Sequence, residues 1–375
     1  MILMGCGDIG PIHESGPAGY VTDATRAVLA SADLRFAQCE RLYSTRGERQ
    51  LGGGSRHGRL DPSMAGIFGD LGIDVVSVAG NHAMDWGVDA FLDTIDALEA
   101  QGIQVVGGGR TMAEARRPVV VVRDGLKVAF LAYCTVLREG YAAEEDRAGV
   151  APLRARTWYE DFDYQPGVPP RVHTIADQDD LAAMEADIGG AKALADVVIV
   201  SFHWGIHFIP KLNAEYQFVM AAAATAAGAD VIVGHHPHLP KAVETYGPSV
   251  CFHSLGNFIM SFPDPSDALV DDMYRDYGAE LEPSHRRLPF GPDAKRSLIA
   301  RVEIGAKGVT ETSFLPVRID EDLRPDVLVP GSEQHAEAVA YMRWASDRVP
   351  HHFCEQPDGR VVVTDPRTSD GVTPR

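Results

Sequence analysis

Four short stretches of the sequence place side chains that can bind a metal ion directly after an apolar run. They contain Asp8 in GCGD, Asn81 and His82 in AGNH, His203 in SFHWG, and His235, His236 and His238 in GHHPH. Side chains at the carboxyl ends of strands gather at the mouth of an α/β sheet, where ligands and substrates usually bind. Imidazole, carboxamide and carboxylate groups suit zinc, manganese or iron. The recurrence therefore predicts a metal site.

The elements that must position these side chains alternate between strands and helices, which is typical of an α/β protein. Strands are expected over residues 1–4, 34–37, 75–79, 196–200, 230–233 and 250–253, with helices over 88–98 and 213–228. Asp124 and Gly125 separate two apolar runs at 118–123 and 126–132, which predicts a hairpin and hence a partly antiparallel sheet.

Two segments, 140–173 and 263–296, are charged, aromatic and rich in proline, with little periodicity. Loops of that length are often lids, binding loops or interfaces. They are expected either near the mouth of the site or at a subunit contact. The chain is otherwise interpreted as one domain over 1–330 with these two insertions. A C-terminal helix and tail follow over 331–375, because Ala338, Met342 and Ala345 fall at helical spacing.

Charge and composition exclude several classes of protein. The net charge of -19 argues against nucleic acid as the main partner, because that binding depends on Lys and Arg. Five cysteines without a CxxC pair argue against a disulfide framework. No window reaches the roughly 18 apolar residues of a membrane span, and no signal peptide is expected. A cytoplasmic protein with a small-molecule substrate is expected, and self-association into a homo-oligomer stays open.

Seven motifs in order carry a family resemblance: GDIG, DLRFAQCE, VVSVAGNHAMDWG, GIQVVGGG, SFHWGIHF, GADVIVGHHPHLPKAVE and HSLGNF. Over about residues 1–262 the chain resembles the CapA-like capsule-synthesis proteins. These look like a branch of the calcineurin-like metallophosphoesterases. The resemblance implies a four-layer α/β/β/α sandwich with a metal centre on loops at one end.

The resemblance also implies roles for individual residues. Asp8 is similar to the first metal carboxylate and Glu40 to the bridging carboxylate. The remaining ligands implied are Asn81, His203, His236 and His238, and His82 is similar to the imidazole that protonates a leaving group. His236 and His238 are preferred over His235 because alternate residues on an extended segment face opposite ways. Such a centre holds one or two divalent ions, and a metal-bound water becomes hydroxide near neutral pH.

The sequence departs from the family pattern at three positions. Gly10 stands where the metallophosphoesterase motif Asp-x-His has its histidine, so one metal position has lost a ligand unless His13 completes it. One tight ion, with a second that is weak or absent, is therefore expected. Gln38 and His207 stand where CapA-like proteins commonly have Asn and Glu. These changes leave the substrate open.

Weaker candidates surround the predicted ligands. Asp85 is expected to support His82, because Ala83 holds the position where an acid usually follows that histidine. Arg56 and His57 lie in a glycine-rich loop that either brings cations to a substrate anion or is simply solvated. Several further residues are expected to orient ligands through hydrogen bonds: His13, His207, His235, His253 and Asn257.

These features favour a cytoplasmic metal-dependent hydrolase with a metallophosphoesterase-like site, in which His82 transfers a proton to the leaving group. Two alternatives stay open. One is a metal-dependent lyase or amide hydrolase that acts on a small molecule, with aromatic and amide-containing molecules among the candidates. The other is a non-catalytic component of capsule or polyglutamate assembly.

Overall fold

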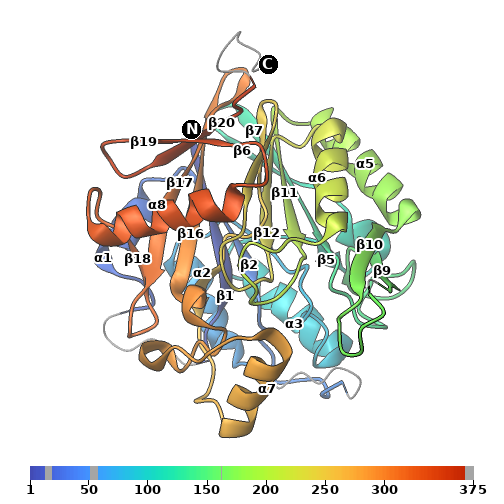
Figure 1. The fold of residues 1–375 in the computed structure, drawn as a ribbon. Helices are drawn as coiled ribbons and strands as arrows, with labels where there is room; N and C mark the ends of the chain where they lie inside the picture. The colour runs from blue at the N-terminus through green and yellow to red at the C-terminus, as the bar shows by residue number, and fades with distance from the viewer. Residues whose placement is uncertain (13–18, 51–57, 162, 368–375) are drawn as a thin grey trace.

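The computed structural model describes residues 1–12, 19–50, 58–161 and 163–367. Two β-sheets lie face to face, and helices cover their outer faces (Figure 1). The ten-stranded sheet has the order β19 (His352–Glu355), β20 (Val361–Thr364), β17 (Gly308–Ile319), β16 (Arg296–Gly305), β1 (Ile2–Gly10), β2 (Leu34–Cys39), β3 (Val75–Ser77) and β4 (Gln104–Val106). Off this path, β15 (Asn257–Met260) pairs with β1, and β18 (Pro325–Val327) pairs with β17.

The six-stranded sheet has the order β13 (Val243–Tyr246), β14 (Ser249–Phe252), β12 (Val231–His235), β11 (Val197–His203), β7 (Leu126–Cys134) and β6 (Val119–Arg123). Two small sheets pair β5 (Gly108–Gly109) with β8 (Gly149–Val150), and β9 (Ala155–Glu160) with β10 (Arg171–Ala176). In the larger sheet β1, β2, β3 and β4 run parallel. In the smaller sheet β7, β11, β12 and β14 run parallel. The two sets of carboxyl ends can therefore deliver side chains to one place.

Apolar side chains fill the space between the sheets. Phe36 of β2 stacks on Phe130 of β7, with ring centroids 5.7 Å apart and an interplanar angle of 7°. The next residue, Leu131, belongs to a second core on the outer face of the six-stranded sheet. That face is covered by α5 (Gln178–Lys192) and α6 (Glu215–Ala227), at the right of Figure 1. Both faces of β7 are buried, which explains its nearly continuous apolar sequence.

The other helices pack on the ten-stranded sheet or on connecting segments. They are α1 (Asp23–Ala30), α2 (Gly66–Asp70), α3 (Gly87–Glu99), α4 (Met112–Ala115), α7 (Asp267–Tyr277) and α8 (Glu333–Ser346), with 3-10 turns η2 (Pro62–Ala65), η3 (Pro283–His285) and η4 (Pro292–Lys295). Among them α3 contacts β4, and α8 contacts β13 and β17. The predicted four-layer α/β/β/α class is therefore confirmed.

The predicted strands and helices are present, and the expected hairpin forms between β6 and β7, with Asp124 and Gly125 both at positive φ. Beyond the predicted α8 the chain adds β19 and β20, where the sequence suggested only a tail. The segment 140–173 contains β8, β9 and the start of β10, while 263–296 contains α7, η3 and η4. Figure 1 shows α7 at the lower end of the molecule, towards which β1 runs from the N-terminus.

The helices of the described ranges are all too short or too polar to cross a lipid bilayer. All five cysteines are free thiols, and Cys354 alone among them is exposed.

Candidate metal centre

Strand ends from both sheets bring the predicted ligands together. From the larger sheet come Asp8 in β1, Glu40 directly after β2, and Asn81 in the turn after β3. From the smaller sheet come His203, which is the last residue of β11, and His236 and His238 in the bend that follows β12. Every one of the six predicted ligands is at most 5% exposed: Asp8, Glu40, Asn81, His203, His236 and His238.

Asp8, Glu40 and His203 form the tightest group, and each offers a ligand atom within 4.8 Å of the others. Nδ1 of His203 lies 3.8 Å from Oε2 of Glu40, and its Nε2 lies 2.9 Å from Oδ1 of Asn81. The His203 and His236 rings are 5.0 Å apart between centroids. The group is thus compact enough for one ion to contact several of its members.

Several buried polar atoms of this cluster have no hydrogen-bond partner among the described residues: both carboxylate oxygens of Glu40, Nδ1 of His203 and Nδ1 of His236. An unpaired polar atom in a protein interior costs roughly 1–3 kcal/mol, and more when it is charged. A bound cation would satisfy carboxylate and imidazole lone pairs together. The residues present therefore fit a divalent transition-metal ion.

Burial shifts the ionisation of the same side chains. It lowers the pKa of His203 to about 3 and that of His238 to about 4, so both imidazoles are neutral at neutral pH. Neutral imidazole is the form that binds a metal. Burial, with the Asp8 charge added, raises the pKa of Glu40 well above its usual value. Burial also acts to raise the pKa of Asp8, but hydrogen bonding and charge from His235 lower it overall.

The GHHPH segment begins in β12 and bends from His236 onwards. His236 and His238 have φ of 96° and 60°, in the left-handed region that side chains other than glycine rarely adopt. A residue held in this left-handed conformation costs on the order of 1–3 kcal/mol, and such residues are common at functional sites. The choice of His236 and His238 as ligands assumed an extended strand, but β12 ends at His235, so that assumption was wrong.

His235 contacts the cluster as well, in the way expected of a residue that orients a ligand through a hydrogen bond. Its Nδ1 lies 3.0 Å from Oδ1 of Asp8, and the backbone N–H of His236 donates to Oδ2 of Asp8 at 3.2 Å. His238 lies on the same carboxylate, with 3.7 Å between its Nδ1 and Oδ2 of Asp8. Asp8 is thus held by the turn after β12.

Asn257 orients His238. Its Oδ1 lies 2.8 Å from Nδ1 of His238, and its Nδ2 donates to the carbonyl oxygens of His238 and Ala294 at 2.9 and 3.1 Å. Asn257 is also in register with Asp8 across the parallel pair of β15 and β1. This contact is of the kind expected for a residue that fixes the orientation of a metal ligand.

His82 and Asp85 form a pair beside the ligands. Nδ1 of His82 lies 2.8 Å from Oδ2 of Asp85, and Nε2 of His82 lies 4.0 Å from Oε1 of Glu40. Oδ1 of Asp85 accepts hydrogen bonds from the Tyr141 hydroxyl at 2.7 Å and from Arg138 at 3.1 Å. Burial lowers the pKa of His82, and Asp85 opposes that shift. The sequence did not single out Arg138 or Tyr141, because they lie in or beside an irregular segment.

Aromatic rings pack against His236 and His238. The ring centroids of His207 and His236 are 3.7 Å apart. Phe290 stacks on His238 at 4.7 Å and on Phe208 at 4.5 Å. Since Phe290 belongs to 263–296, that segment lies beside the ligands, which is one of the two positions expected for it.

Among the remaining candidates, His253 is not brought to the cluster. His253 lies 2.9 Å from Glu244 through its Nε2 and stacks on Trp204, in the second hydrophobic core. It does not contact the six predicted ligands, because β14 turns its ring towards the helices. His13, Arg56 and His57 lie outside the described residues.

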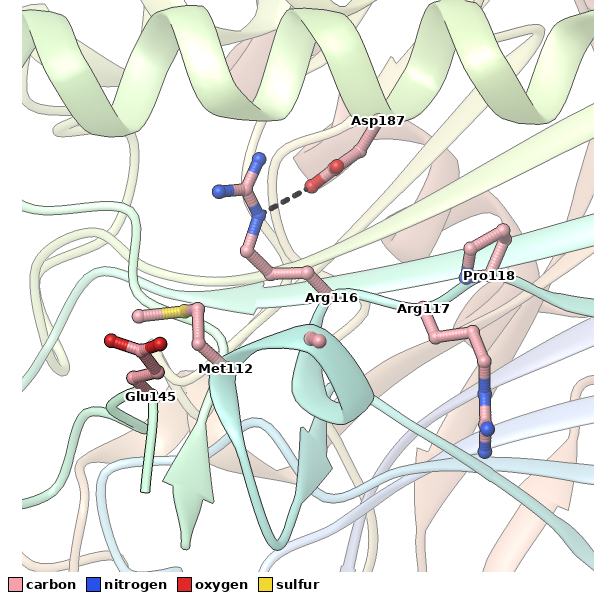
Figure 2. A pocket seen from close by; sticks show the side chains of 7 residues that line it. Met112, Arg116, Arg117, Pro118, Glu145 and Asp187 are labelled. Atoms are coloured by element: carbon pink, nitrogen blue, oxygen red, sulfur yellow. Dashed lines mark hydrogen bonds and ion pairs between the residues drawn. The ribbon is translucent and has the colours of Figure 1, made fainter. Parts of the chain in front are cut away.

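A surface pocket of about 690 Å³ lies elsewhere, around α4, and contains none of the predicted site residues (Figure 2). Figure 2 shows Arg116 pointing at Asp187, to which its Nε donates at 2.7 Å, while Arg117 points away. The Arg116 charge is therefore already neutralised. The rest of the lining is formed by Met112, Ala113, Arg117, Pro118 and Glu145.

Comparison with known sequences gives a family match for most of the chain. Residues 5–261 match the family described as bacterial capsule synthesis protein PGA_cap. The chain is 33% identical over 194 residues to the PGA biosynthesis protein CapA of Bacillus subtilis (strain 168), covering 52% of this chain and 44% of that protein. It is 29% identical over 215 residues to the capsule biosynthesis protein CapA of Bacillus anthracis, covering 56% and 47%. The chain spans about half the length of the curated relatives it matches.

Solved structures with a similar arrangement share little sequence. The calcineurin-like phosphoesterase YfkN from Bacillus subtilis aligns with 92% of this chain and 98% of its own, with a TM-score of 0.41 and 13% identity. A hypothetical protein from Thermus thermophilus aligns with 84% of this chain and 98% of its own, with a TM-score of 0.43 and 15% identity.

Proposed function

The chain belongs to the bacterial capsule synthesis protein family PGA_cap, and we propose that it is a metal-dependent hydrolase that cleaves a phosphoester-like bond in a small molecule. The observation that carries the proposal is the buried group of Asp8, Glu40 and His203, with ligand atoms within 4.8 Å of one another. Its unpaired carboxylate and imidazole atoms have the chemistry of a metal site.

The surrounding residues supply the rest of the chemistry. A divalent ion held by these ligands would polarise a substrate oxygen and activate a water molecule. As the imidazolium, His82 gives the proton on Nε2 to the leaving group. Its Nδ1–H stays hydrogen-bonded to the Asp85 carboxylate, which stabilises the protonated ring. Arg138 and Tyr141 hold Asp85 in turn. Phe208 and Phe290 exclude water from the side of His238.

A second candidate function is an accessory role in capsule or polyglutamate assembly. It is supported by the names of the relatives, which describe PGA and capsule biosynthesis and, for a Mycobacterium tuberculosis protein that is 29% identical over 205 residues, probable polyglutamine synthesis. In that case the buried centre would bind metal without turning over a phosphoester. The lyase alternative gains no support from the comparisons.

A cytoplasmic location is part of the proposal. All five cysteines are free thiols, and one of them, Cys354, is exposed. Reduced thiols are the usual state of cysteine in a reducing compartment. Fractionation of a producing cell, with detection of the native protein, tests this part directly.

The test of function combines metal analysis with turnover of an aryl phosphate. Wild type is expected to carry a divalent transition metal and to hydrolyse the aryl phosphate. His203→Ala is expected to lose both properties. His352→Ala is the matched control, because His352 is exposed on β19. Metal without hydrolysis favours the accessory role, and wild-type protein that takes up no metal overturns the proposal.

A further inference from the structure

The position of the missing motif histidine is filled by another side chain. A Cβ atom at Gly10 would lie 2.8 Å from Cγ of Arg41, and 3.2 Å from both Nε of Arg41 and Cβ of Glu40. The contact with Cγ is so short that something would have to shift. A histidine at position 10 and Arg41 in its present place therefore exclude one another.

Arg41 is firmly held in this place. The residue is 4% exposed. Its Nε donates to the carbonyl oxygen of Gly10 at 3.1 Å, and its Nη2 donates to that of Ser261 at 3.3 Å. The guanidinium also lies over the Phe262 ring, 4.7 Å from the centroid. These contacts fix the group without neutralising its charge, because carbonyl oxygens and a ring face carry no full charge.

Among the described residues, no carboxylate forms an ion pair with Arg41, and no atom accepts a hydrogen bond from Nη1 of Arg41. The guanidinium stays charged at neutral pH, as arginine does in proteins. Arg41 directly follows the predicted ligand Glu40, so its charge lies beside the cluster. A buried cation without a carboxylate partner among the described residues is costly, which favours a functional reason for it.

We propose that Arg41 supplies the second positive charge of this centre, in place of a second tightly held ion, and that its guanidinium binds an oxyanion of the substrate. The inference rests on the proposed metal-dependent function and adds a substrate class to it. A guanidinium presents its donors in a planar fork that matches phosphate and carboxylate oxygens. The oxyanion is therefore a phosphoryl group or a carboxylate next to the bond that is cleaved.

Calorimetric titration of inorganic phosphate and of acetate tests the inference without any turnover. Both anions are titrated into metal-free and zinc-loaded wild type, Arg41→Met and Arg41→Lys. Arg41→Met removes the charge and keeps much of the volume, and is expected to weaken anion binding about tenfold or more. Arg41→Lys keeps the charge and loses the fork, so the loss should be smaller. Tighter binding of phosphate than of acetate assigns a phosphoryl group, and the reverse order assigns a carboxylate.

Gly10→Ala is a second, independent probe. It leaves the Arg41 charge in the protein but displaces the side chain, so it should weaken anion binding in the same direction as Arg41→Met. Circular dichroism spectra and melting temperatures confirm that each variant is folded. Equal anion affinity in wild type and a folded Arg41→Met would overturn the inference. So would two equivalents of tightly bound zinc in wild type.

The two proposals fail in different ways. If wild type binds metal and hydrolyses aryl phosphate while Arg41→Met binds phosphate as wild type does, the inference on Arg41 is wrong and the function stands. If wild type shows no turnover, yet phosphate binding to metal-free protein depends on Arg41, the hydrolase function is wrong and the oxyanion site stands.

Discussion

The His82 imidazole is hydrogen-bonded to Asp85, with 2.8 Å between Nδ1 of His82 and Oδ2 of Asp85. A carboxylate can only accept, so Nδ1 carries the proton of this hydrogen bond. The other ring nitrogen lies 4.0 Å from Oε1 of Glu40, at the edge of the ligand cluster. This arrangement separates proton transfer from metal binding, and the first two predictions test that separation.

We expect His82→Asn to lower kcat by about 10² to 10⁴, because a positioned general acid contributes a factor of that size. Metal content and KM should change little. Steady-state kinetics and elemental analysis on the same preparation measure these quantities. The loss should shrink for an aryl phosphate whose leaving group needs no proton. A variant that loses its metal would place His82 among the ligands instead.

We expect Tyr141→Phe to lower kcat less than His82→Asn does, by about tenfold, because one of the hydrogen bonds that hold Asp85 is lost. Metal content should be unchanged. Tyr159→Phe, at an exposed tyrosine of β9, is the matched control. An unchanged kcat in Tyr141→Phe would show that Asp85 does not depend on that hydroxyl.

Metal removal should destabilise the protein. A ligand that binds only the folded state raises stability by about 4 kcal/mol at a thousandfold excess over its dissociation constant. The melting temperature of wild type should therefore fall on chelation and recover with zinc, whereas that of Glu40→Gln should respond little. Scanning calorimetry with and without chelator measures this. Equal responses of the two proteins would exclude Glu40 from the ligands.

The interface between the sheets should dominate the stability of the fold. Phe130→Ala removes the ring that stacks on Phe36 and should cost about 3–5 kcal/mol. Tyr164→Ala should change the free energy of unfolding by less than about 0.5 kcal/mol, because Tyr164 is 96% exposed. Urea unfolding of the two variants provides the comparison. Similar losses in both would mean that the sheets are not held together by this core.

Acid should weaken the attachment of the C-terminal segment. Asp365 accepts hydrogen bonds from Arg367 at 2.6 Å and from the backbone N–H of Gly247 at 3.0 Å. Chiefly the Arg367 hydrogen bond lowers the pKa of Asp365 from 3.8 to about 2. The pKa is lower in the folded state, so this stabilisation is complete above about pH 4 and is lost as pH falls towards 2.

Because Arg367 is largely exposed, the effect should be about 1 kcal/mol. Asp365→Asn should remove it, so the stabilities of wild type and variant, measured by urea unfolding, should converge between about pH 4 and pH 2. A constant difference across that range would show that Asp365 is not ionised differently in the two states.

Most of the sheets and five of the six predicted ligands (Asp8, Asn81, His203, His236 and His238) could be predicted because their motifs carry local signals, whereas Glu40 was implied only by the family resemblance. The run before His203 is apolar and ends in a ligand type, and the same is true of the run before His235. The β16–β17 hairpin also had a signal that was missed: a two-residue connection between Gly305 and Gly308, with Gly308 at φ 106°.

Other parts of the centre have no local signal. Arg41 is placed by Gly10, Ser261 and Phe262, which are far from it in the sequence. The bend after β12 depends on His236 and His238 in left-handed conformations, which a strand pattern does not reveal. The position of Arg41 and the conformation of the segment after β12 both depend on contacts that form only in the folded chain.

The pairing of β1 has a consequence for the order of assembly. This strand is clamped between β2 on one side and β15 and β16 on the other, and Asp8 faces Asn257 in register. Contacts that join such distant parts of a chain form slowly. While a ribosome is still making the second half of the protein, β1 has an open edge that is prone to wrong pairing. We therefore expect the proposed metal site to be complete only after β15 and β16 have been made and have paired with β1.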